Sequence, residues 1–576
     1  TMVNQEVAEI LQHMAELLEY FGDPTDHFRI RAYKNASLTL RELPENIADI
    51  AKRKELKKIP GIGEGIAKKI EEYVANGKVN EYEFLKKAMP AGLFELMAIP
   101  FLGPKKVRML NKELGITNVK ELEKAVKNGS IEELKGFGKK SADKILEGIQ
   151  MKNEQGERRF VGEVFLTVNE LIRAIRKFPG VSRAEPAGSF RRREETIGDI
   201  DILVSVKNPA KDSVKIMERF VKLPGVAHIL GKGDTKSSVA MKDGLQVDLR
   251  VVSENQFGSA LQYFTGSKKH NVHLRTFAKA KGFKVSEYGF FKISGSKEKL
   301  VASKTEEECY KALGLQYIPP EFRTDSGEIE AATKNMLPKN LIELKDIKGD
   351  LHAHSTYSDG GNTIEQMAME AHRRGYEYIA ITDHSPSLHV AHGLDKKRLV
   401  QKKKEIDKLN EKLPIRILFG TEVDIMKNGS IDYPDVILQE FDIVVASIHS
   451  YFNEDNTDRL LAAMGNPYVH IIGHPSGRLL GQRKPYQLDY EKIFERAAET
   501  GTIIEINAQP QRLDLADIYI RSASRAGVKF SIDSDAHSTD GLWLMDLGVS
   551  WARRGWVEKQ QVVNTLSLDA LKRALK

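Results

Sequence analysis

The stretch that decides the fold is residues 186–204, which read PAGSFRRREETIGDIDILV. Two acids, Asp199 and Asp201, stand two residues apart at the start of an apolar run. Because successive side chains of a strand point to opposite faces, both carboxylates are expected on one face, where they repel each other unless a cation lies between them. Upstream, Gly188 and Ser189 offer backbone amides and a hydroxyl suited to phosphate oxygens, and three arginines follow. The stretch therefore predicts metal-assisted phosphoryl transfer.

A third acid for such a site is Asp248, in the strand-like run 246–252. Two ions held by three carboxylates can clamp both the attacking and the leaving oxygen of an in-line displacement. A D-x-D pair by itself often only ends a strand at a solvated edge. The glycine-serine turn before the pair and the later acid after it favour the two-metal interpretation.

The series GSFRR, GDID, a later strand acid and YFTGS at 263–267 resembles the nucleotidyltransferase core of family X DNA polymerases, the polymerase beta group. The resemblance covers roughly the first 335 residues, including 312–332, which resembles the closing segment of the family. It implies an α+β palm with a thumb, in which the three acids hold two Mg²⁺ (or Mn²⁺) that align a primer 3′-hydroxyl with the α-phosphate of a dNTP. It also implies that Arg275 contacts the template. The implied dNTP contacts are Gly188, Ser189, Arg192, Gly198, Tyr263, Phe264, Gly266 and Asn271.

Before this core, a short glycine motif that enters a basic helix occurs three times. Turn amides at a helix N-terminus bind a DNA phosphate without reading sequence, which is the chemistry of the helix-hairpin-helix motif. One such turn could be an ordinary helix start, but three, each followed by lysines, favour DNA backbone binding. The glycines are Gly61, Gly63 and Gly65 in the first copy, Gly103 in a degenerate copy, and Gly136 and Gly138 in the third.

The N-terminal helices also resemble the small domain with which animal members of family X remove a 5′-deoxyribose phosphate. The resemblance implies a Schiff-base lysine at Lys69, with Tyr33 at a second matching position. Gly65 and Glu81 stand where the family usually has lysines, which should weaken the binding of a 5′-phosphate. Lys69 is therefore either a lyase residue or a solvated lysine facing DNA, and the second interpretation is slightly favoured.

After residue 346 short apolar strands alternate with helices, which predicts a parallel barrel with its chemistry at the strand C-termini. Histidines and acids collect at those ends, and 10 of the 15 histidines lie beyond residue 350. Nine N/O ligands without sulfur exceed one tetrahedral site, so two or three Zn²⁺, Mn²⁺ or Fe²⁺ ions are expected. The expected strands are 350–354, 377–383, 415–423, 442–448, 469–474, 502–507 and 529–534. The expected ligands are His352, His354, Asp359, His384, Glu422, His449, His474, Asp535 and His537.

This constellation resembles the polymerase and histidinol phosphatase (PHP) domain, which is fused behind the core in bacterial and archaeal family X polymerases. The resemblance implies a distorted (β/α)7 barrel and a 3′→5′ exonuclease. It also associates 3′-end processing and AP endonuclease activity with the domain. Arg478 and Arg512 either hold substrate phosphates or are surface arginines.

The composition agrees with several globular domains, because the chain has 576 residues and 29% of them are charged. Residues 151–345 carry a net charge of +9, against +2 before and −4 after them, so this part is expected to face a polyanion. The single cysteine, Cys309, and the lack of a long apolar run predict a cytoplasmic protein without membrane contact. A monomer is expected. The predicted domains are two helical helix-hairpin-helix domains at 1–90 and 91–150, a palm at 151–260, a thumb at 261–320, a linker at 321–345 and the PHP domain at 346–576.

The predicted function is a DNA-directed DNA polymerase that fills short gaps in DNA repair and trims the 3′ end at a second metal site. Its partners are gapped or primer-template DNA, bound without sequence preference, and dNTPs. One alternative is a nucleotidyltransferase with a non-DNA acceptor fused to a phosphomonoesterase. The other is a DNA-binding scaffold whose catalytic sites have decayed. The helix-hairpin-helix copies count against the first alternative, and the complete acid and histidine sets count against the second.

Overall fold

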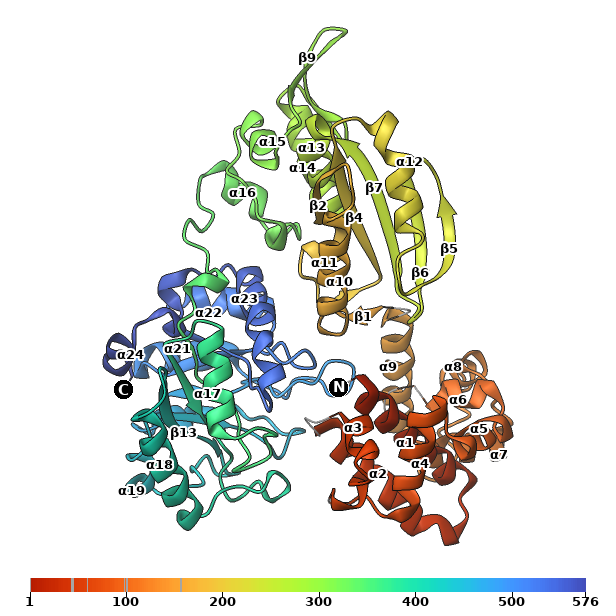
Figure 1. Cartoon of the computed structure of the whole chain (residues 1–576), viewed down its shortest axis with the longest axis vertical. Helices are drawn as coiled ribbons and strands as arrows, with labels where there is room; N and C mark the ends of the chain where they lie inside the picture. Colours follow the sequence, from red (N-terminus) through yellow and green to blue (C-terminus); the bar gives the residue numbers. More distant parts are fainter. Residues whose placement is uncertain are drawn as a thin grey trace.

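A computed structural model describes residues 2–42, 46–59, 61–97, 99, 102–155 and 158–575 of the chain (Figure 1). The N-terminal helices, coloured red to orange, form one part, and helix α9 leads from them to the sheet of the palm. The thumb lies beyond the palm, and the chain then returns to the barrel, coloured from green through cyan to blue, which lies across the palm's base from the N-terminal helices. Among the described residues, no helix combines the length and the apolar character that a membrane crossing requires.

The N-terminal part is entirely helical where it is described, apart from its turns. One apolar cluster runs from Val7 on the first helix to Ile149 on the last, so the two expected domains at 1–90 and 91–150 share a core. The apolar stripe of each amphipathic helix supplies that core. The helices are α1 (Met2–Phe21), α2 (His27–Glu42), α3 (Ile47–Lys52), α4 (Glu64–Asn76), α5 (Asn80–Ala88), α6 (Ala91–Met97), α7 (Pro104–Leu114), α8 (Val119–Lys127) and α9 (Lys139–Gln155).

The palm is a mixed sheet in the order β2-β4-β7-β6-β5, and a two-stranded pair, β1 with β3, lies at its base. Strands β4 and β7 run parallel at its centre, and their apolar side chains pack against α10 and α12. The elements are β1 (Arg159–Phe160), α10 (Val161–Arg176), β2 (Val181–Pro186), α11 (Gly188–Arg191), β3 (Thr196–Ile197), β4 (Asp199–Val206), α12 (Pro209–Phe220), β5 (Val226–Lys232), β6 (Lys236–Met241) and β7 (Gln246–Ser253).

The thumb combines helices with a three-stranded antiparallel sheet in the order β10-β9-β8. The prediction that 321–345 is a surface linker is wrong, because Phe322, Ile329 and Leu337 of this segment are buried in the thumb core. The α-helix of this segment, Glu328–Thr333, has only six residues, too few for an apolar period to stand out in the sequence. The elements are α13 (Phe257–Thr265), α14 (Lys268–Ala280), β8 (Phe283–Ser286), β9 (Gly289–Ser294), β10 (Lys297–Ala302), α15 (Glu306–Ala312) and α16 (Glu328–Thr333).

The C-terminal part, described without a gap up to residue 575, contains seven parallel strands that follow one another in chain order. A single bridge between Ala353 and Ala536 joins the first strand segment to the last, so the sheet curls into a nearly closed barrel. The strands are β11 (Gly349–Asp350), β12 (Tyr378–Ile381), β13 (Arg416–Asp424), β14 (Ile443–Ser447), β15 (Ile471–Ile472), β16 (Ile503–Asn507) and β17 (Phe530–Asp533). The helices are α17 (Ile364–Arg373), α18 (Lys396–Asn410), α19 (Asp435–Leu438), α20 (Thr457–Gly465), α21 (Tyr490–Thr500), α22 (Asp517–Arg525), α23 (Leu544–Arg554) and α24 (Leu568–Ala574).

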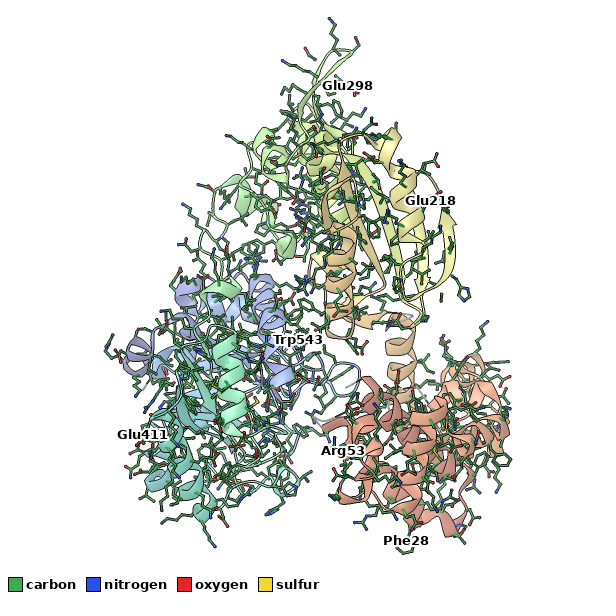
Figure 2. All side chains as sticks on the ribbon, in the orientation of Figure 1. Phe28, Arg53, Glu218, Glu298, Glu411 and Trp543 are labelled. Atoms are coloured by element: carbon green, nitrogen blue, oxygen red, sulfur yellow. The ribbon has the colours of Figure 1, made fainter. Side chains whose placement is uncertain are left out.

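The palm and the barrel share one apolar core. Trp543, labelled in Figure 2 at the junction, stacks on Phe165 of α10 with ring centroids 5.4 Å apart. A Cβ added to Gly162 would lie 2.1 Å from the side chain of Pro510, so only glycine permits this close approach. The palm and the barrel are therefore packed directly against each other.

Candidate functional sites in the palm and the barrel

The three palm acids lie at one end of the central strand pair. Asp201 on β4 is directly opposite Asp248 on β7, and Asp199 precedes Asp201 by two residues on the same strand. Because β4 and β7 are parallel and in register, all three side chains leave the same face of the sheet. Burial, together with the nearby carboxylates of Asp199 and Asp248, raises the pKa of Asp201 to about 6. Such mutual repulsion is what divalent cations relieve, so the residues fit a two-metal site.

Asp248 is also held by two hydrogen bonds from its own sheet. Gln246 donates to one carboxylate oxygen at 3.0 Å, and the ammonium group of Lys236 on β6 lies 3.0 Å from the other. Burial opposes the charged form, but these hydrogen bonds outweigh it and lower the pKa of Asp248. Asp248 therefore stays ionised. Lys236 was not predicted as part of the site, because nothing in the sequence around this lysine relates it to the strand that follows.

The glycine-serine turn lies directly beside the acids. Gly188 has φ +57°, and a Cβ added there would lie 2.5 Å from a carboxylate oxygen of Asp201. Glycine is therefore required at this position both by conformation and by space. Ser189 follows it in the one-turn helix α11, and Gly198 directly precedes β4. The backbone of this turn is thus positioned to approach a phosphate next to the carboxylates.

Arg192 connects this turn to the thumb. Its guanidinium group donates to the carbonyl oxygen of Thr265 and lies 3.3 Å from the carboxylate of Glu194. A Cβ added to Gly266, which has φ +71°, would lie 3.1 Å from the same guanidinium group. Burial lowers the pKa of Arg192, and the pairing with Glu194 opposes that effect. Arg192 therefore lies where the palm meets the YFTGS segment.

The remaining candidate dNTP contacts lie around the bend between α13 and α14. The rings of Tyr263 and Phe264 meet edge to face at 5.2 Å. Asn271 donates to the carbonyl oxygen of Tyr263 at 2.8 Å and accepts a hydrogen bond from Gln262. One turn further along α14, Arg275 is exposed. These side chains therefore lie at the end of α13 and on the first two turns of α14, on either side of the bend whose Thr265 contacts Arg192.

A buried ion-pair network that the sequence analysis missed holds the thumb to the palm. Glu306 of α15 pairs with Arg191 of the palm at 2.6 Å and with Arg323 at 2.6 Å. Burial by itself would raise the pKa of Glu306, but the two guanidinium groups outweigh it and lower the pKa to about 2. Arg323 comes from the segment predicted to be a linker, so no sequence signal pointed to it.

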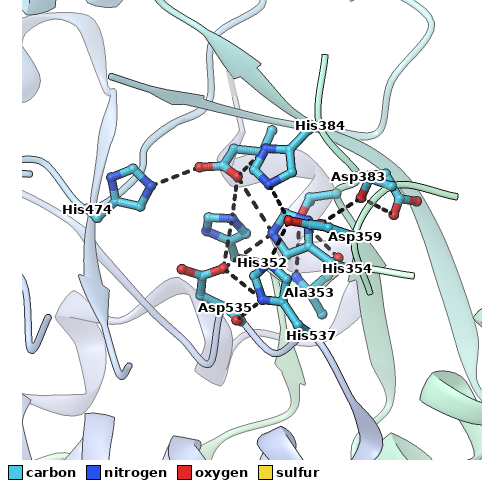
Figure 3. Close-up of polar contacts among 12 residues, drawn as sticks. His352, Ala353, His354, Asp359, Asp383, His384, His474, Asp535 and His537 are labelled. Carbon is cyan, nitrogen blue, oxygen red and sulfur yellow. Dashed lines mark hydrogen bonds and ion pairs between the residues drawn. The ribbon is translucent and has the colours of Figure 1, made fainter. Parts of the chain in front are cut away.

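The barrel histidines and acids converge on one centre (Figure 3). Ligand atoms within 4.8 Å of one another form three groups. Glu422 lies between imidazoles, with His474 at 2.9 Å, His384 at 3.0 Å and His352 at 3.4 Å. The three groups are His354, Asp359, His384 and His537; His352, His354 and Asp535; and His384, Glu422 and His449. Three groups of this kind fit the expected two or three ions.

The hydrogen bonding of the imidazoles is an independent test of that fit. Among the described residues, Nε2 of His352, both ring nitrogens of His354 and Nδ1 of His474 are buried without a hydrogen-bond partner. Buried polar atoms are almost always hydrogen-bonded, so such lone pairs in a carboxylate-lined hollow are those expected of metal ligands. The residues present therefore fit bound divalent ions.

Side chains outside the ligand set orient it. Glu505 accepts a hydrogen bond from Nδ1 of His352 at 2.6 Å, and Asp424 accepts one from Nδ1 of His449 at 2.6 Å. Such contacts fix which imidazole nitrogen faces the metal. The sequence analysis missed both acids, although Glu505 stands out as a charge within the apolar strand β16. A charged residue within a buried apolar strand was the signal from which Glu505 could have been predicted.

A buried lysine supports the second strand end. Lys402 pairs with Asp383 at 2.9 Å and donates to the carbonyl oxygens of Ile381 and Gly420. Burial lowers the pKa of Lys402, and the carboxylate of Asp383 opposes that effect. Lys402 lies within a run of three lysines whose other members give no hint that this one is buried.

Of the two barrel arginines, Arg478 has neither of its two predicted roles. Arg478 is buried, donates to the carbonyl oxygen of Arg512 and pairs with Glu195 of the palm at 2.9 Å. Arg478 is therefore neither a surface arginine nor free to hold a substrate phosphate, because its guanidinium group is already paired with Glu195 of the palm. The guanidinium group of Arg512 lies 3.9 Å from the carboxylate of Asp535, beside the metal ligands.

The glycines of the N-terminal turns lie at helix starts. Gly63 and Gly103 are the N-cap residues of α4 and α7, and Gly138 directly precedes α9. A Cβ added at any of the three, or at Gly65, would meet no atom within 4 Å, so internal packing does not require glycine there. Open backbone amides at helix N-termini are suited to phosphate. The first turns of the complete copies contain Gly61 at φ +81° and Gly136 at φ +94°.

The fold and the two centres define a class of protein, a nucleotidyltransferase of the polymerase beta type joined to a PHP-type barrel. Family models agree with each part: a helix-hairpin-helix domain matches residues 2–79 and a tandem of that motif matches 94–151. The DNA polymerase beta thumb matches 260–324, and the PHP domain matches 350–509.

The chain is 39% identical to the DNA polymerase/3′-5′ exonuclease PolX of Bacillus subtilis over 581 aligned positions, which cover all of both chains. A probable phosphatase of Caldanaerobacter subterraneus is 33% identical over 39% of this chain and 90% of its own. A probable phosphatase of Syntrophotalea carbinolica is 31% identical over 37% of this chain. The chain belongs to family X of the DNA polymerases, in the form that carries a C-terminal PHP domain. The predicted family and fold class are confirmed.

Proposed function

We propose that the protein fills short gaps in DNA by adding dNTPs at the palm and removes nucleotides from the 3′ end at the barrel. The observation that supports synthesis is the in-register pairing that sets Asp201 opposite Asp248, with Asp199 on the same face. The alternative with a non-DNA acceptor loses support, because a relative named as a polymerase and exonuclease covers the full chain. The decayed scaffold loses support, because eight of the nine predicted barrel ligands, all but His474, fall into groups that could hold a metal ion.

In the proposed synthesis, the three palm acids hold two Mg²⁺ (or Mn²⁺). Bound there, the ions would stabilise both the attacking 3′-oxygen and the leaving pyrophosphate oxygen of an in-line displacement. The turn at Gly188 and Ser189, with Arg192 and Gly198, binds the triphosphate. Tyr263, Phe264 and Gly266 bind the sugar, Asn271 contacts the incoming base, and Arg275 contacts the template strand. The chain releases pyrophosphate as the new phosphodiester bond forms.

In the proposed degradation, the nine barrel residues hold two or three Zn²⁺, Mn²⁺ or Fe²⁺ ions. Bound there, the ions would activate water and polarise the phosphodiester. Glu505 and Asp424 orient His352 and His449, and Arg512 is near enough to the ligands to attract the cleaved phosphate. Sequence-independent binding of gapped DNA comes from the N-terminal glycine turns and the lysines after them. The protein acts as a monomer.

The direct test is gap filling and metal analysis on the full-length protein. On a duplex with a short gap, the protein is expected to extend the primer with dNTPs and Mg²⁺, and to shorten the 3′ end when dNTPs are withheld. Plasma mass spectrometry of protein purified without chelator is expected to find about two to three equivalents of transition metal per chain. A metal-free protein that still degrades DNA would contradict the barrel assignment.

The geometry around Lys69 does not favour a lyase. Its ammonium group lies 2.8 Å from the carboxylate of Glu81 and 5.6 Å from the ring centre of Tyr33. Burial lowers the pKa of Lys69, but the hydrogen bond to Glu81 and the contact with Tyr33 outweigh it, so the pKa is raised. A protonated amine cannot attack an aldehyde, so Lys69 in this setting is a poor Schiff-base nucleophile.

Borohydride trapping on DNA with a 5′-deoxyribose phosphate tests this inference. The unaltered protein is expected to give little covalent product at neutral pH. Glu81→Gln is expected to raise the yield by roughly twofold to fivefold, the value of a partly exposed ion pair, while Glu83→Gln on the same helix leaves it unchanged. Efficient trapping by the unaltered protein, lost in Lys69→Ala, would show instead that Lys69 is a lyase residue.

A further inference from the structure

A cavity of about 740 Å³ lies where the palm, the thumb and the barrel meet. The thumb contributes the start of α14, with Lys268 and Lys269, and the palm contributes Glu194. The barrel contributes Arg521 and Arg525 from helix α22. Neither family model for the thumb or for the PHP domain extends to α22, since they match 260–324 and 350–509.

The cavity has an excess of positive charge. Its wall also includes Arg554, whose guanidinium group is 2.6 Å from Asp517 and 3.6 Å from Glu194, so these three charges largely satisfy one another. Among the described residues, no ion pair involves the remaining cations of the wall. Those cations are Lys268, Lys269, Arg521 and Arg525. Several unpaired cations around one hollow focus the potential that attracts an anion.

The cavity opens beside the residues proposed to bind the triphosphate. Ser267, in its wall, directly follows Gly266, against which the guanidinium group of Arg192 lies. Glu194, also in the wall, is the ion-pair partner of Arg192 at 3.3 Å. A phosphate that leaves or approaches Arg192 therefore has this hollow next to it.

One of the barrel arginines is held in place before any ligand arrives. The guanidinium group of Arg521 stacks on the ring of Trp556, 3.6 Å from its centre, and donates to Ser326 at 3.0 Å. Trp556 in turn stacks on Phe322 of the thumb at 4.7 Å. Burial lowers the pKa of Arg521, and the charge of Arg525 lowers it further. A fixed guanidinium group loses little entropy when it binds phosphate.

We propose that this cavity binds the polyphosphate of a nucleotide, so that Arg521 and Arg525 of the barrel, with Lys268 and Lys269 of the thumb, extend the nucleotide site of the palm. The proposal rests on the proposed function of the palm as a polymerase. The polyphosphate is that of the incoming dNTP or the pyrophosphate that leaves, because both share the same chemistry beside Arg192. In either case the barrel contributes to synthesis by binding polyphosphate with its arginines, and its own metal centre is not involved.

The test compares steady-state gap filling by full-length variants. Arg525 is exposed and makes no ion pair among the described residues, so Arg525→Gln should leave the fold intact. It is expected to raise the KM for dNTP by about fivefold, the upper value for one exposed cation, with kcat and the Kd for gapped DNA within twofold of the unaltered protein. Arg521→Gln combined with Arg525→Gln raises KM further. The matched control is Lys572→Gln with Arg573→Gln, which removes two cations from α24 on the barrel's far side.

Product inhibition separates the two sources of polyphosphate. If the inhibition constant of inorganic pyrophosphate rises in Arg525→Gln while the KM for dNTP is unchanged, the cavity binds the leaving pyrophosphate. If the inhibition constant and the KM both rise, the cavity binds the incoming dNTP as well as the leaving pyrophosphate. If neither constant changes, the proposal is overturned. If only the Kd for DNA rises, the cavity binds a DNA strand and the proposal is also overturned. An unaltered protein that extends no primer would instead refute the function of the palm.

Discussion

Replacing Asp199 with alanine is expected to lower primer extension on gapped DNA by about three orders of magnitude, because it removes one of the three carboxylates that would hold the proposed ions and, with them, the stabilisation of the developing charge. Asp199 is exposed at the start of β4, so its loss should not disturb the apolar strand behind it. Degradation of the 3′ end belongs to the barrel and is expected to stay within twofold of the unaltered rate. Extension and degradation are measured on the same labelled gapped duplex.

The control for this variant is Asp234→Ala, which removes an exposed palm acid between β5 and β6. It is expected to retain full extension. If Asp199→Ala lost both activities together, the assignment of two separate sites would be wrong. If it retained extension, the palm acids would not be the metal ligands of synthesis.

The second large effect is expected from Glu422→Gln. Glu422 is buried and lies within 4 Å of five imidazoles, so its negative charge compensates the cationic character of the centre. Glutamine has the same shape but a neutral amide, which binds a divalent ion far more weakly than a carboxylate does. Degradation of the 3′ end is expected to fall by at least about a hundredfold, with a loss of bound transition metal, while extension on gapped DNA persists.

Metal content and primer extension are the two readouts that distinguish the loss of a metal ligand from the loss of the fold. Glu411→Gln, at the exposed end of α18, is the matched control and should keep both its metal and its nuclease activity. Glu422→Gln protein that loses extension as well has lost its fold or its interface with the palm. Protein that keeps full nuclease activity would exclude Glu422 as a ligand.

Several features of the fold could be predicted because the physics behind them is local. The alternation of strand side chains places Asp199 and Asp201 on one face without any knowledge of the rest of the chain. Parallel strands that alternate with helices bring their C-termini to one end of a barrel, so histidines placed after each strand were expected to meet. The glycine turns before α4 and α9 were also recognisable, because a helix start is a local event.

Other features depend on contacts between distant segments. The sequence around Arg323 resembles a linker, but in the structure this segment packs into the thumb core and Arg323 pairs with Glu306. Arg478 looks like a surface arginine until the palm brings Glu195 to 2.9 Å. The state of Lys69 depends on Glu81, which lies on the next helix. In each case burial and a partner of opposite charge, neither of which is encoded locally, decide what the side chain does.

The sequence alone therefore determined the chemistry of this protein: the carboxylates, imidazoles and glycine turns, and the strands and helices on which they lie. Only the tertiary structure decided how the palm, the thumb and the barrel pack into one another, which charges they neutralise, and which cations stay unpaired at their junction. The physical reason is range, because backbone geometry acts between neighbours in the chain, whereas burial and Coulomb interactions act between neighbours in space.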